Sequence, residues 1–279
     1  MTETLSLTIA HSPDPDDAFM FYALVQGKIE TAPFHFSHVL QDIETLNRAA
    51  LSGTYELTAL SFHVYPYVAD RYILLTCGSS MGARYGPILV ARENISVTDL
   101  KKVRIAVPGT LTTAFLLLRL VEPEIRFVVV PFDRILDEVR YGRADVGLII
   151  HEGQLTYSSL GLRKILDLGQ WWEDQTHLPL PLGGNAIRRD LGESVIHHVS
   201  RLLRQSIEFA LTHRDDALTY ALQFGRGLSR ELADRFVGMY VNALTLDCGA
   251  SGRKAIETLF RMAYERGLIP APCSPQFVE

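Results

Sequence analysis

The chain has 279 residues, of which 47% are hydrophobic and 21% are charged, a composition typical of one large or two smaller globular domains. Its formal net charge of -5 excludes a bulk attraction to nucleic acid or acidic membranes, so we expect neither partner. The sequence lacks a signal-peptide pattern and an apolar stretch of about 18 residues that could span a membrane. We therefore expect a cytoplasmic protein.

The first predicted strand and helix are joined by a turn rich in aspartate. Residues 5–10 predict the strand, and the apolar residues 18–25 predict the helix. Asp14, Asp16 and Asp17 in the turn could be metal ligands. Capping of the helix explains them more simply, so we expect no metal site.

The next part of the chain alternates predicted strands and helices. Residues 57–61 form a short expected strand that ends in the hydroxyl group of Ser61. The other expected strands are residues 34–40, 72–77 and 88–91, and the expected helices are residues 42–51 and 62–68. Glycine-containing segments at residues 78–82 and 85–87 break this pattern.

From residue 99 the pattern restarts as an alternation of strands and helices, which implies a parallel sheet with right-handed crossovers. The expected strands are residues 103–107, 125–130 and 146–150, and the expected helices are residues 112–121 and 132–141.

Two threonines, Thr112 and Thr113, lie where a strand end meets a helix start. Free backbone N–H groups and the helix dipole at such a place can hold a carboxylate or a phosphate. The same residues would also suit a plain helix cap, and the sequence leaves both interpretations open. Dinucleotide-binding, Walker and G-x-S-x-G motifs are absent from the sequence, so no nucleotide cofactor is indicated.

The strongest single candidate is His151, which ends the apolar run of residues 146–150. Open α/β sheets bind their ligands at the carboxyl ends of such strands. Histidine titrates near neutrality, so it can accept or donate a proton there. The alternative is that His151 only ends the strand and forms a hydrogen bond to a neighbouring loop.

The last third of the chain is mostly helical. Before it, residues 165–168 and 186–189 predict strands, residues 170–176 predict a short helix, and residues 178–185 resemble a linker. The expected helices are residues 194–211, 215–224, 229–240 and 253–266. The three cysteines, Cys77, Cys248 and Cys273, fit neither a disulfide framework nor a metal motif.

Breaks near Gly86-Pro87 and Gly183-Gly184 bracket the central strand–helix block and predict two lobes joined by two crossing segments. We expect residues 1–91 and 186–279 to form a larger discontinuous lobe and residues 92–185 to form a smaller inserted lobe. A hinge of this kind lets a cleft close over a small ligand.

The sequence resembles the menaquinone-biosynthesis enzymes of the futalosine pathway, and among them the family of 1,4-dihydroxy-6-naphthoate synthases. The resemblance covers nearly the whole chain. It rests on Asp42-Ile43-Glu44-Thr45-Leu46-Asn47-Arg48, Gly86-Pro87, Pro108-Gly109 with Thr112-Thr113-Ala114, Gly147-Leu148-Ile149-Ile150-His151-Glu152, Leu178-Pro179-Leu180-Pro181-Leu182-Gly183 and Tyr240-Val241-Asn242-Ala243.

The resemblance implies an α/β fold of the two-lobed periplasmic-binding-protein-like type II, in which each lobe is a mixed sheet flanked by helices and a cleft lies between the lobes. It implies that His151 is the catalytic base. The residues that it places around the substrate are Ala59, Leu60, Ser61, Thr113 and Ala114. Further candidates are Thr112, Asp16, Asp17 and Asn47.

One segment departs from the family pattern. Where the family has Ser-Pro-Cys-Pro-Asn-Asp-Thr-Phe, this chain has Ser12-Pro13-Asp14-Pro15-Asp16-Asp17-Ala18-Phe19. Two additional carboxylates near a ligand would disfavour an anionic substrate unless they are paired or capped.

The reaction implied by the resemblance converts cyclic dehypoxanthinyl futalosine to 1,4-dihydroxy-6-naphthoate by a base-catalysed elimination, without a metal or another cofactor. A second interpretation is a chorismate dehydratase of the same pathway, against which the Ile150-His151-Glu152 segment argues. A third is a non-catalytic cytoplasmic protein that binds a small carboxylate.

Overall fold

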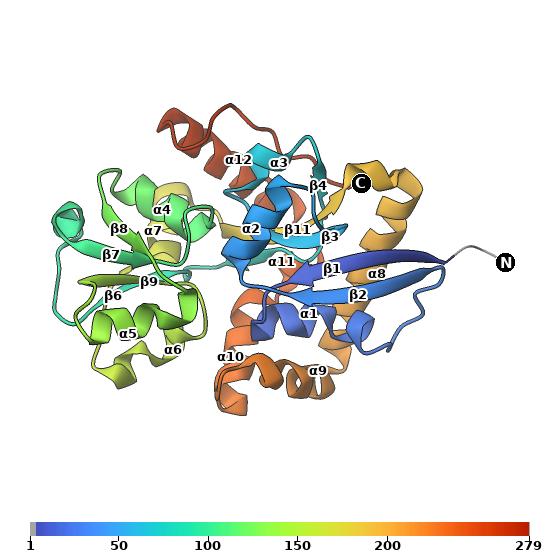
Figure 1. Ribbon diagram of the computed structural model, residues 1–279, viewed down its shortest axis with the longest axis horizontal. Coiled ribbons are helices and arrows are strands. Elements are labelled where there is room, and N and C mark those ends of the chain that lie inside the picture. Colours follow the sequence, from blue (N-terminus) through green and yellow to red (C-terminus); the bar gives the residue numbers. More distant parts are fainter. Residues whose placement is uncertain (1–3, 279) are drawn as a thin grey trace.

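The computed structural model describes residues 4–278 and shows two α/β lobes side by side (Figure 1). Each lobe is built on one mixed β-sheet with helices packed against it. Residues 1–3 and 279, which the sequence assigns to the larger lobe, lie outside the described part of the chain.

The sheet of the larger lobe has the order β2-β1-β3-β11-β4, and β5 also pairs with β11. β1 runs parallel to β2 and β3, whereas β11 is antiparallel to β3, β4 and β5. The strands are β1 (Leu5–His11), β2 (Phe34–Leu40), β3 (Leu57–Ser61), β4 (Tyr72–Leu74), β5 (Ser80–Gly82) and β11 (Leu180–Arg188).

The sheet of the smaller lobe has the order β10-β6-β9-β7-β8. β7 is parallel to β8 and β9, as the alternation from residue 99 implies, whereas β6 is antiparallel to both of its neighbours, so the sheet is mixed. The strands are β6 (Ile88–Ala91), β7 (Arg104–Val107), β8 (Arg126–Val129), β9 (Val146–Ile149) and β10 (Arg163–Asp167).

Helices cover both sheets. Those of the larger lobe are α1 (Pro15–Val25), α2 (Ile43–Leu51), α3 (Tyr65–Val68), α8 (Glu193–Thr212), α9 (Arg214–Ala221), α10 (Arg230–Tyr240), α11 (Ala243–Leu246) and α12 (Gly249–Glu265). Those of the smaller lobe are α4 (Thr113–Val121), α5 (Ile135–Arg140), α6 (Gly153–Thr156) and α7 (Leu168–Thr176).

The core of the larger lobe lies on both faces of its sheet. The apolar faces of α1, α8, α9 and α10 pack with Leu7 and Ile9 of β1 in one cluster. A second cluster joins Phe62 and Phe260 of the larger lobe to Leu116 and Trp172 of the smaller lobe. Because this buried apolar cluster crosses between the lobes, the two lobes also pack against each other on one side of the cleft.

The sheets divide the chain close to the two predicted breaks, but not at the predicted residue numbers. β6, which we expected to lie in the larger lobe because it precedes residue 92, is hydrogen-bonded within the smaller lobe's sheet. β11 begins at Leu180, six residues before the predicted return to the larger lobe. The lobe boundaries themselves remain a prediction.

The expected linker at residues 178–185 is mostly strand. Its prolines and glycines resemble a break, yet residues from Leu180 onward pair with β5 and β3. A side chain at Gly183 would crowd the carbonyl oxygen of Leu60, so the glycine permits a close approach of two strands. Local sequence pattern could not show this, because the partner strand lies more than 100 residues away.

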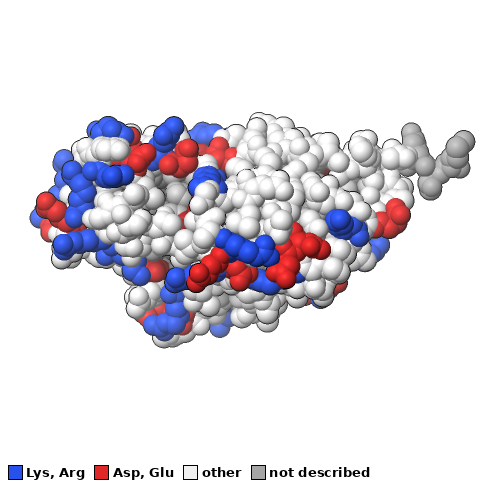
Figure 2. All heavy atoms as spheres, turned by 90° about the horizontal axis from the view of Figure 1, so that it is seen from below, with Lys and Arg blue, Asp and Glu red and all other residues white. Residues whose placement is uncertain are grey.

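The described surface mixes positive and negative charge. Figure 2 shows Lys and Arg side chains interspersed with Asp and Glu on the face that it draws. Ion pairs elsewhere among the described residues include Arg84–Glu173 and Arg143–Glu138. Within residues 4–278 no helix is both long and apolar enough to cross a membrane.

Candidate active site

A cavity of about 120 Å³ lies between the lobes and is lined by residues of both. The carboxyl ends of β1 and β3 and the start of α4 all reach it. Of the sequence-predicted residues, it is lined by Ala59, Leu60, Ser61, Thr113, Ala114, Asp16 and Asp17. His151, Thr112 and Asn47 are not part of this lining, although His151 follows the lining residue Ile150, Thr112 precedes Thr113, and Asn47 is hydrogen-bonded to Ser61.

The end of β3 places Ser61 at the cavity, and Asn47 of α2 holds it there. Asn47 is fully buried, and its Oδ1 accepts a hydrogen bond from the Ser61 backbone N–H at 2.8 Å. Its Nδ2 donates to Ser61 Oγ at 3.0 Å and to the Leu111 carbonyl oxygen at 3.2 Å. Ser61 Oγ therefore keeps its own hydrogen for a ligand in the cavity.

The start of α4 is ordered by two threonines with different tasks. Thr112 is the N-cap, and its Oγ1 accepts from the Phe115 backbone N–H at 3.2 Å. Thr113 Oγ1 donates to the Leu182 carbonyl oxygen at 2.6 Å and accepts from the His63 N–H at 3.1 Å. Both hydroxyl groups are thus used by the protein, and the first N–H groups of α4 remain for an anion.

Asp16 and Asp17 in the first turn of α1 are buried and line the cavity. The Ser12 backbone N–H donates to Asp17 Oδ2 at 3.0 Å. Burial raises the pKa of Asp17 to about 6, and burial together with the Asp17 charge raises the pKa of Asp16 well above its ordinary value. Burial therefore favours the neutral, protonated form of both carboxyl groups that face this cavity.

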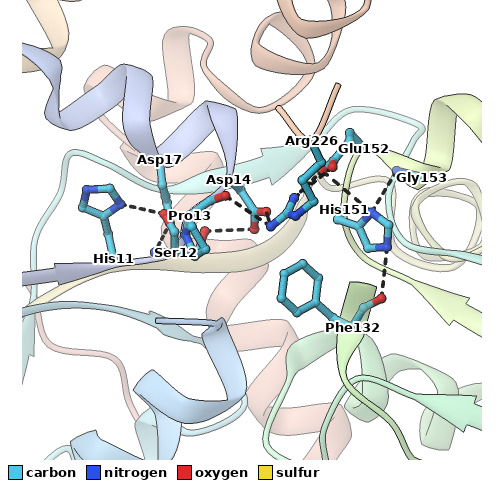
Figure 3. A network of polar contacts seen from close by, with 10 residues as sticks. All are labelled: His11, Ser12, Pro13, Asp14, Asp17, Phe132, His151, Glu152, Gly153 and Arg226. Carbon is cyan, nitrogen blue, oxygen red and sulfur yellow. Dashed lines mark hydrogen bonds and ion pairs between the residues drawn. The ribbon is translucent and has the colours of Figure 1, made fainter. Parts of the chain in front are cut away.

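Asp14 is the second aspartate that departs from the family pattern, and it is paired with an arginine far along the chain. Arg226, in the loop before α10, donates through Nη2 to Asp14 Oδ1 at 2.9 Å. Through Nη1 it donates to both carboxylate oxygens of Glu152, each at 2.9 Å. Figure 3 shows this chain of contacts reaching from the β1–α1 turn to the loop after β9. The additional charge of Asp14 is thus compensated.

His151 is buried, and both of its ring nitrogens have partners (Figure 3). Nδ1 accepts from the Gly153 N–H at 3.0 Å, and Nε2 lies 3.1 Å from the Phe132 carbonyl oxygen. Nε2 must therefore carry the proton of a neutral ring. Burial lowers the pKa of His151, while Glu152 and Asp14 raise it and Arg226 lowers it.

The polar residues that line the cavity but were not among the sequence candidates include Asn185 and Tyr240. Asn185 of β11 lines it and donates from Nδ2 to the Gly78 carbonyl oxygen at 3.0 Å, but its buried Oδ1 has no partner within the described residues. Tyr240 also lines it and donates to Gln154 Oε1 at 3.0 Å. Tyr240 belonged to a family marker segment, whereas Asn185 gave no local signal.

The acidic residues of the site do not form a metal centre. Among the described residues no group of three or more His, Cys, Asp or Glu side chains is arranged to hold a metal ion. Asp14, which could have completed such a group, is directed to Arg226 instead. The three cysteines are all free.

Comparisons with known proteins agree with this architecture. The chain is 45% identical over 273 residues to 1,4-dihydroxy-6-naphtoate synthase of Thermus thermophilus, covering 98% of this chain and 99% of that protein. A solved structure of a protein from Archaeoglobus fulgidus has a TM-score of 0.91 and 49% identity, covering 95% of this chain and 98% of that chain.

A more distant neighbour shows the fold. The alkanesulfonate-binding protein of Xanthomonas axonopodis has a TM-score of 0.72 at 15% identity and covers 98% of this chain and 97% of that chain. The predicted periplasmic-binding-protein-like fold is therefore confirmed. The family model described as menaquinone biosynthesis matches residues 7–265, and the chain belongs to the menaquinone biosynthesis family.

Proposed function

We propose that the chain forms 1,4-dihydroxy-6-naphthoate from cyclic dehypoxanthinyl futalosine, as a carbon–carbon lyase that needs no cofactor. The observation that carries the proposal is the cavity between the lobes, which has a helix N-terminus and a serine hydroxyl in its wall. The similarity to a full-length naphthoate synthase supports the same reaction. The product is a carboxylate, and such an anion suits the N–H groups of a helix start.

In this scheme the first N–H groups of α4, at Thr113 and Ala114, hold an anionic or polar group of the substrate together with the Ser61 hydroxyl. Asn47 keeps Ser61 in position through its three hydrogen bonds. Holding the substrate in one orientation lowers the barrier to proton removal. Closure of the lobes excludes water from the intermediate.

We propose His151 as the base that removes a proton, after which a carbon fragment leaves and the second ring becomes aromatic. Its lowered pKa leaves the ring neutral at pH 7, as a base must be. To act, Nδ1 must exchange the Gly153 N–H for the substrate, because both nitrogens are engaged in the free protein. Binding of substrate supplies the energy for that exchange.

Asp17 is the alternative base. It lines the cavity directly, and its pKa of about 6 is close to the operating pH, where general bases are most effective. The two assignments predict different variants as inactive: His151→Ala in the first case and Asp17→Asn in the second.

The test is a chromatographic assay of purified protein with cyclic dehypoxanthinyl futalosine. The wild type should form the naphthoate, and His151→Ala should lower turnover by roughly 100-fold or more. His35→Ala, which truncates an exposed histidine of β2, is the matched control and should retain full turnover. If the wild type forms no naphthoate but consumes chorismate, the dehydratase interpretation replaces this one; binding without any turnover would favour a carboxylate-binding protein.

A further inference from the structure

One arginine connects the two lobes beside the candidate active site. Arg226 belongs to the larger lobe, whereas Glu152 follows His151 directly in the smaller lobe. We call the chain of contacts from Asp14 through Arg226 to Glu152 the Arg226 bridge (Figure 3). Glu152 is buried and Arg226 is less than one third exposed, so solvent screens this bridge only partly.

The bridge lies between two cavities. Asp14 lines the inner cavity described above, while Pro13 and Arg226 line an outer cavity of about 520 Å³. That outer cavity is also lined by Phe132 and Pro108 of the smaller lobe, so it too lies between the lobes. A change in the bridge would therefore alter the wall that separates the inner cavity from the outer one.

The bridge also contacts the residues that hold His151. The Arg226 guanidinium lies over the Phe132 ring, with Cζ 4.7 Å from the ring centroid. The carbonyl oxygen of the same Phe132 accepts the hydrogen bond from His151 Nε2. Arg226 thus touches both Phe132, whose carbonyl oxygen is the acceptor for the imidazole, and Glu152, the residue that follows His151.

The loop that carries Arg226 has an unusual conformation. Arg226 has a φ of 47°, a left-handed value that residues with a Cβ rarely adopt. It is flanked by Gly225 and Gly227, and the latter also has a positive φ of 84°. Such a backbone persists where surrounding contacts stabilise it, and here those contacts are the ones made by the guanidinium.

We propose that Arg226 is a positioning residue, which joins the lobes through Asp14 and Glu152 and holds the His151 loop in the geometry needed for proton removal. The kinetic effects expected of Arg226 rest on the proposed function, whereas its effect on the conformation of the His151 loop does not. A guanidinium suits the task because one planar group can donate to two carboxylates at once. A lysine ammonium group carries the same charge but lacks the planar set of donors that can serve two carboxylates at once.

The charges of the bridge give the proposal a specific signature in pH dependence. The charged groups that act on His151 are Glu152 and Asp14, which favour its protonation, and Arg226, which opposes it. Arg226→Gln removes the opposing charge and should move the acidic limb of the kcat profile to higher pH. Glu152→Gln should move the limb to lower pH, and Arg226→Lys should leave it nearly in place.

The experiment compares Arg226→Gln and Arg226→Lys with Arg230→Gln as the matched control. Arg230→Gln removes the same charge four residues away, and within residues 4–278 the Arg230 side chain is hydrogen-bonded to Asp215 and Thr219 of the larger lobe. Arg226→Gln should lower kcat about 10- to 100-fold, the effect expected from a misplaced catalytic group, and Arg226→Lys should recover part of it. Arg230→Gln should match the wild type.

Hydrogen exchange at residues 151–156 provides a readout that does not need turnover. The backbone N–H of Gly153 is held by His151 Nδ1, so Arg226→Gln should speed exchange in this segment about tenfold or more, while Arg230→Gln should not. If the wild type forms no naphthoate, the proposed function is overturned, and the hydrogen-exchange result alone then tests whether Arg226 positions the His151 loop. Unchanged exchange and an unshifted pH limb in Arg226→Gln would overturn the positioning role.

Discussion

Asn47→Ala tests whether the buried Asn47 amide holds Ser61 and the segment at Leu111 in position beside the cavity. The substitution removes three hydrogen bonds, two to Ser61 and one to the Leu111 carbonyl oxygen. It leaves the buried Ser61 N–H without its acceptor and takes one donor from the part-buried Leu111 carbonyl oxygen, at about 1–3 kcal/mol each. A total loss of about 3 kcal/mol should lower the melting temperature by roughly 6–12 °C for a chain of this size.

The assay is calorimetry or thermal melting monitored by circular dichroism, with KM measured on the same preparations. KM should rise because the Ser61 hydroxyl loses its orientation. The matched control is Arg48→Ala on the same helix, which breaks only the i,i+4 pair with Glu44 at 2.7 Å and should cost at most about 0.5 kcal/mol. A melting temperature for Asn47→Ala within about 2 °C of this control would refute the reasoning.

Three further outcomes are expected. Thr113→Val removes the hydroxyl donor to Leu182 and should cost about 1–3 kcal/mol of stability; KM should change little, because the backbone N–H and not the hydroxyl faces the substrate, and a large rise in KM would contradict this. Gly109→Ala would place a methyl group on the Glu44 carboxylate and should destabilise the protein by about 1–3 kcal/mol, measured by denaturant unfolding; wild-type stability would show that Glu44 moves freely. Asp16→Asn should raise the melting temperature at pH 8 more than at pH 4.

The sign of the Asp16 prediction follows from its pKa. Burial and the Asp17 charge raise the folded-state pKa of Asp16 well above 3.8, so the folded state binds more protons than the unfolded state over the pH range between the two values. Stability from this group is therefore present at low pH and is lost as pH rises towards the folded-state pKa. Asparagine has no such loss, and equal gains at pH 4 and pH 8 would show that Asp16 titrates normally.

Much of the fold could be predicted from local pattern. The strand at residues 57–61 and the helix at residues 42–51 are within one residue of β3 and α2. Apolar runs bounded by glycine and capping residues specify such elements through nearest neighbours alone. The glycine-containing breaks indicated two lobes, and the family resemblance added the periplasmic-binding-protein-like fold type, which the comparisons confirm.

Local pattern failed where distant strands decide the structure. The segment beginning at Leu180 forms β11 because β3 and β5 supply partners for its backbone groups. The helix α12 starts at Gly249 and not near residue 253, although its first turn contains glycines that usually separate helices. Packing of the rest of the helix outweighs the low helix propensity of these residues.

Residue order along the chain was sufficient to predict which side chains lie at strand ends and helix starts: Ser61, Thr113, the aspartates of the first turn and His151. These positions depend on the alternation of short elements along the chain, which neighbouring residues encode. The folded arrangement was needed to show that Asp14 is paired with Arg226, more than 200 residues later, and that both His151 nitrogens have hydrogen-bond partners. Electrostatic and hydrogen-bond partners depend on distances in space, which residue order along the chain does not specify.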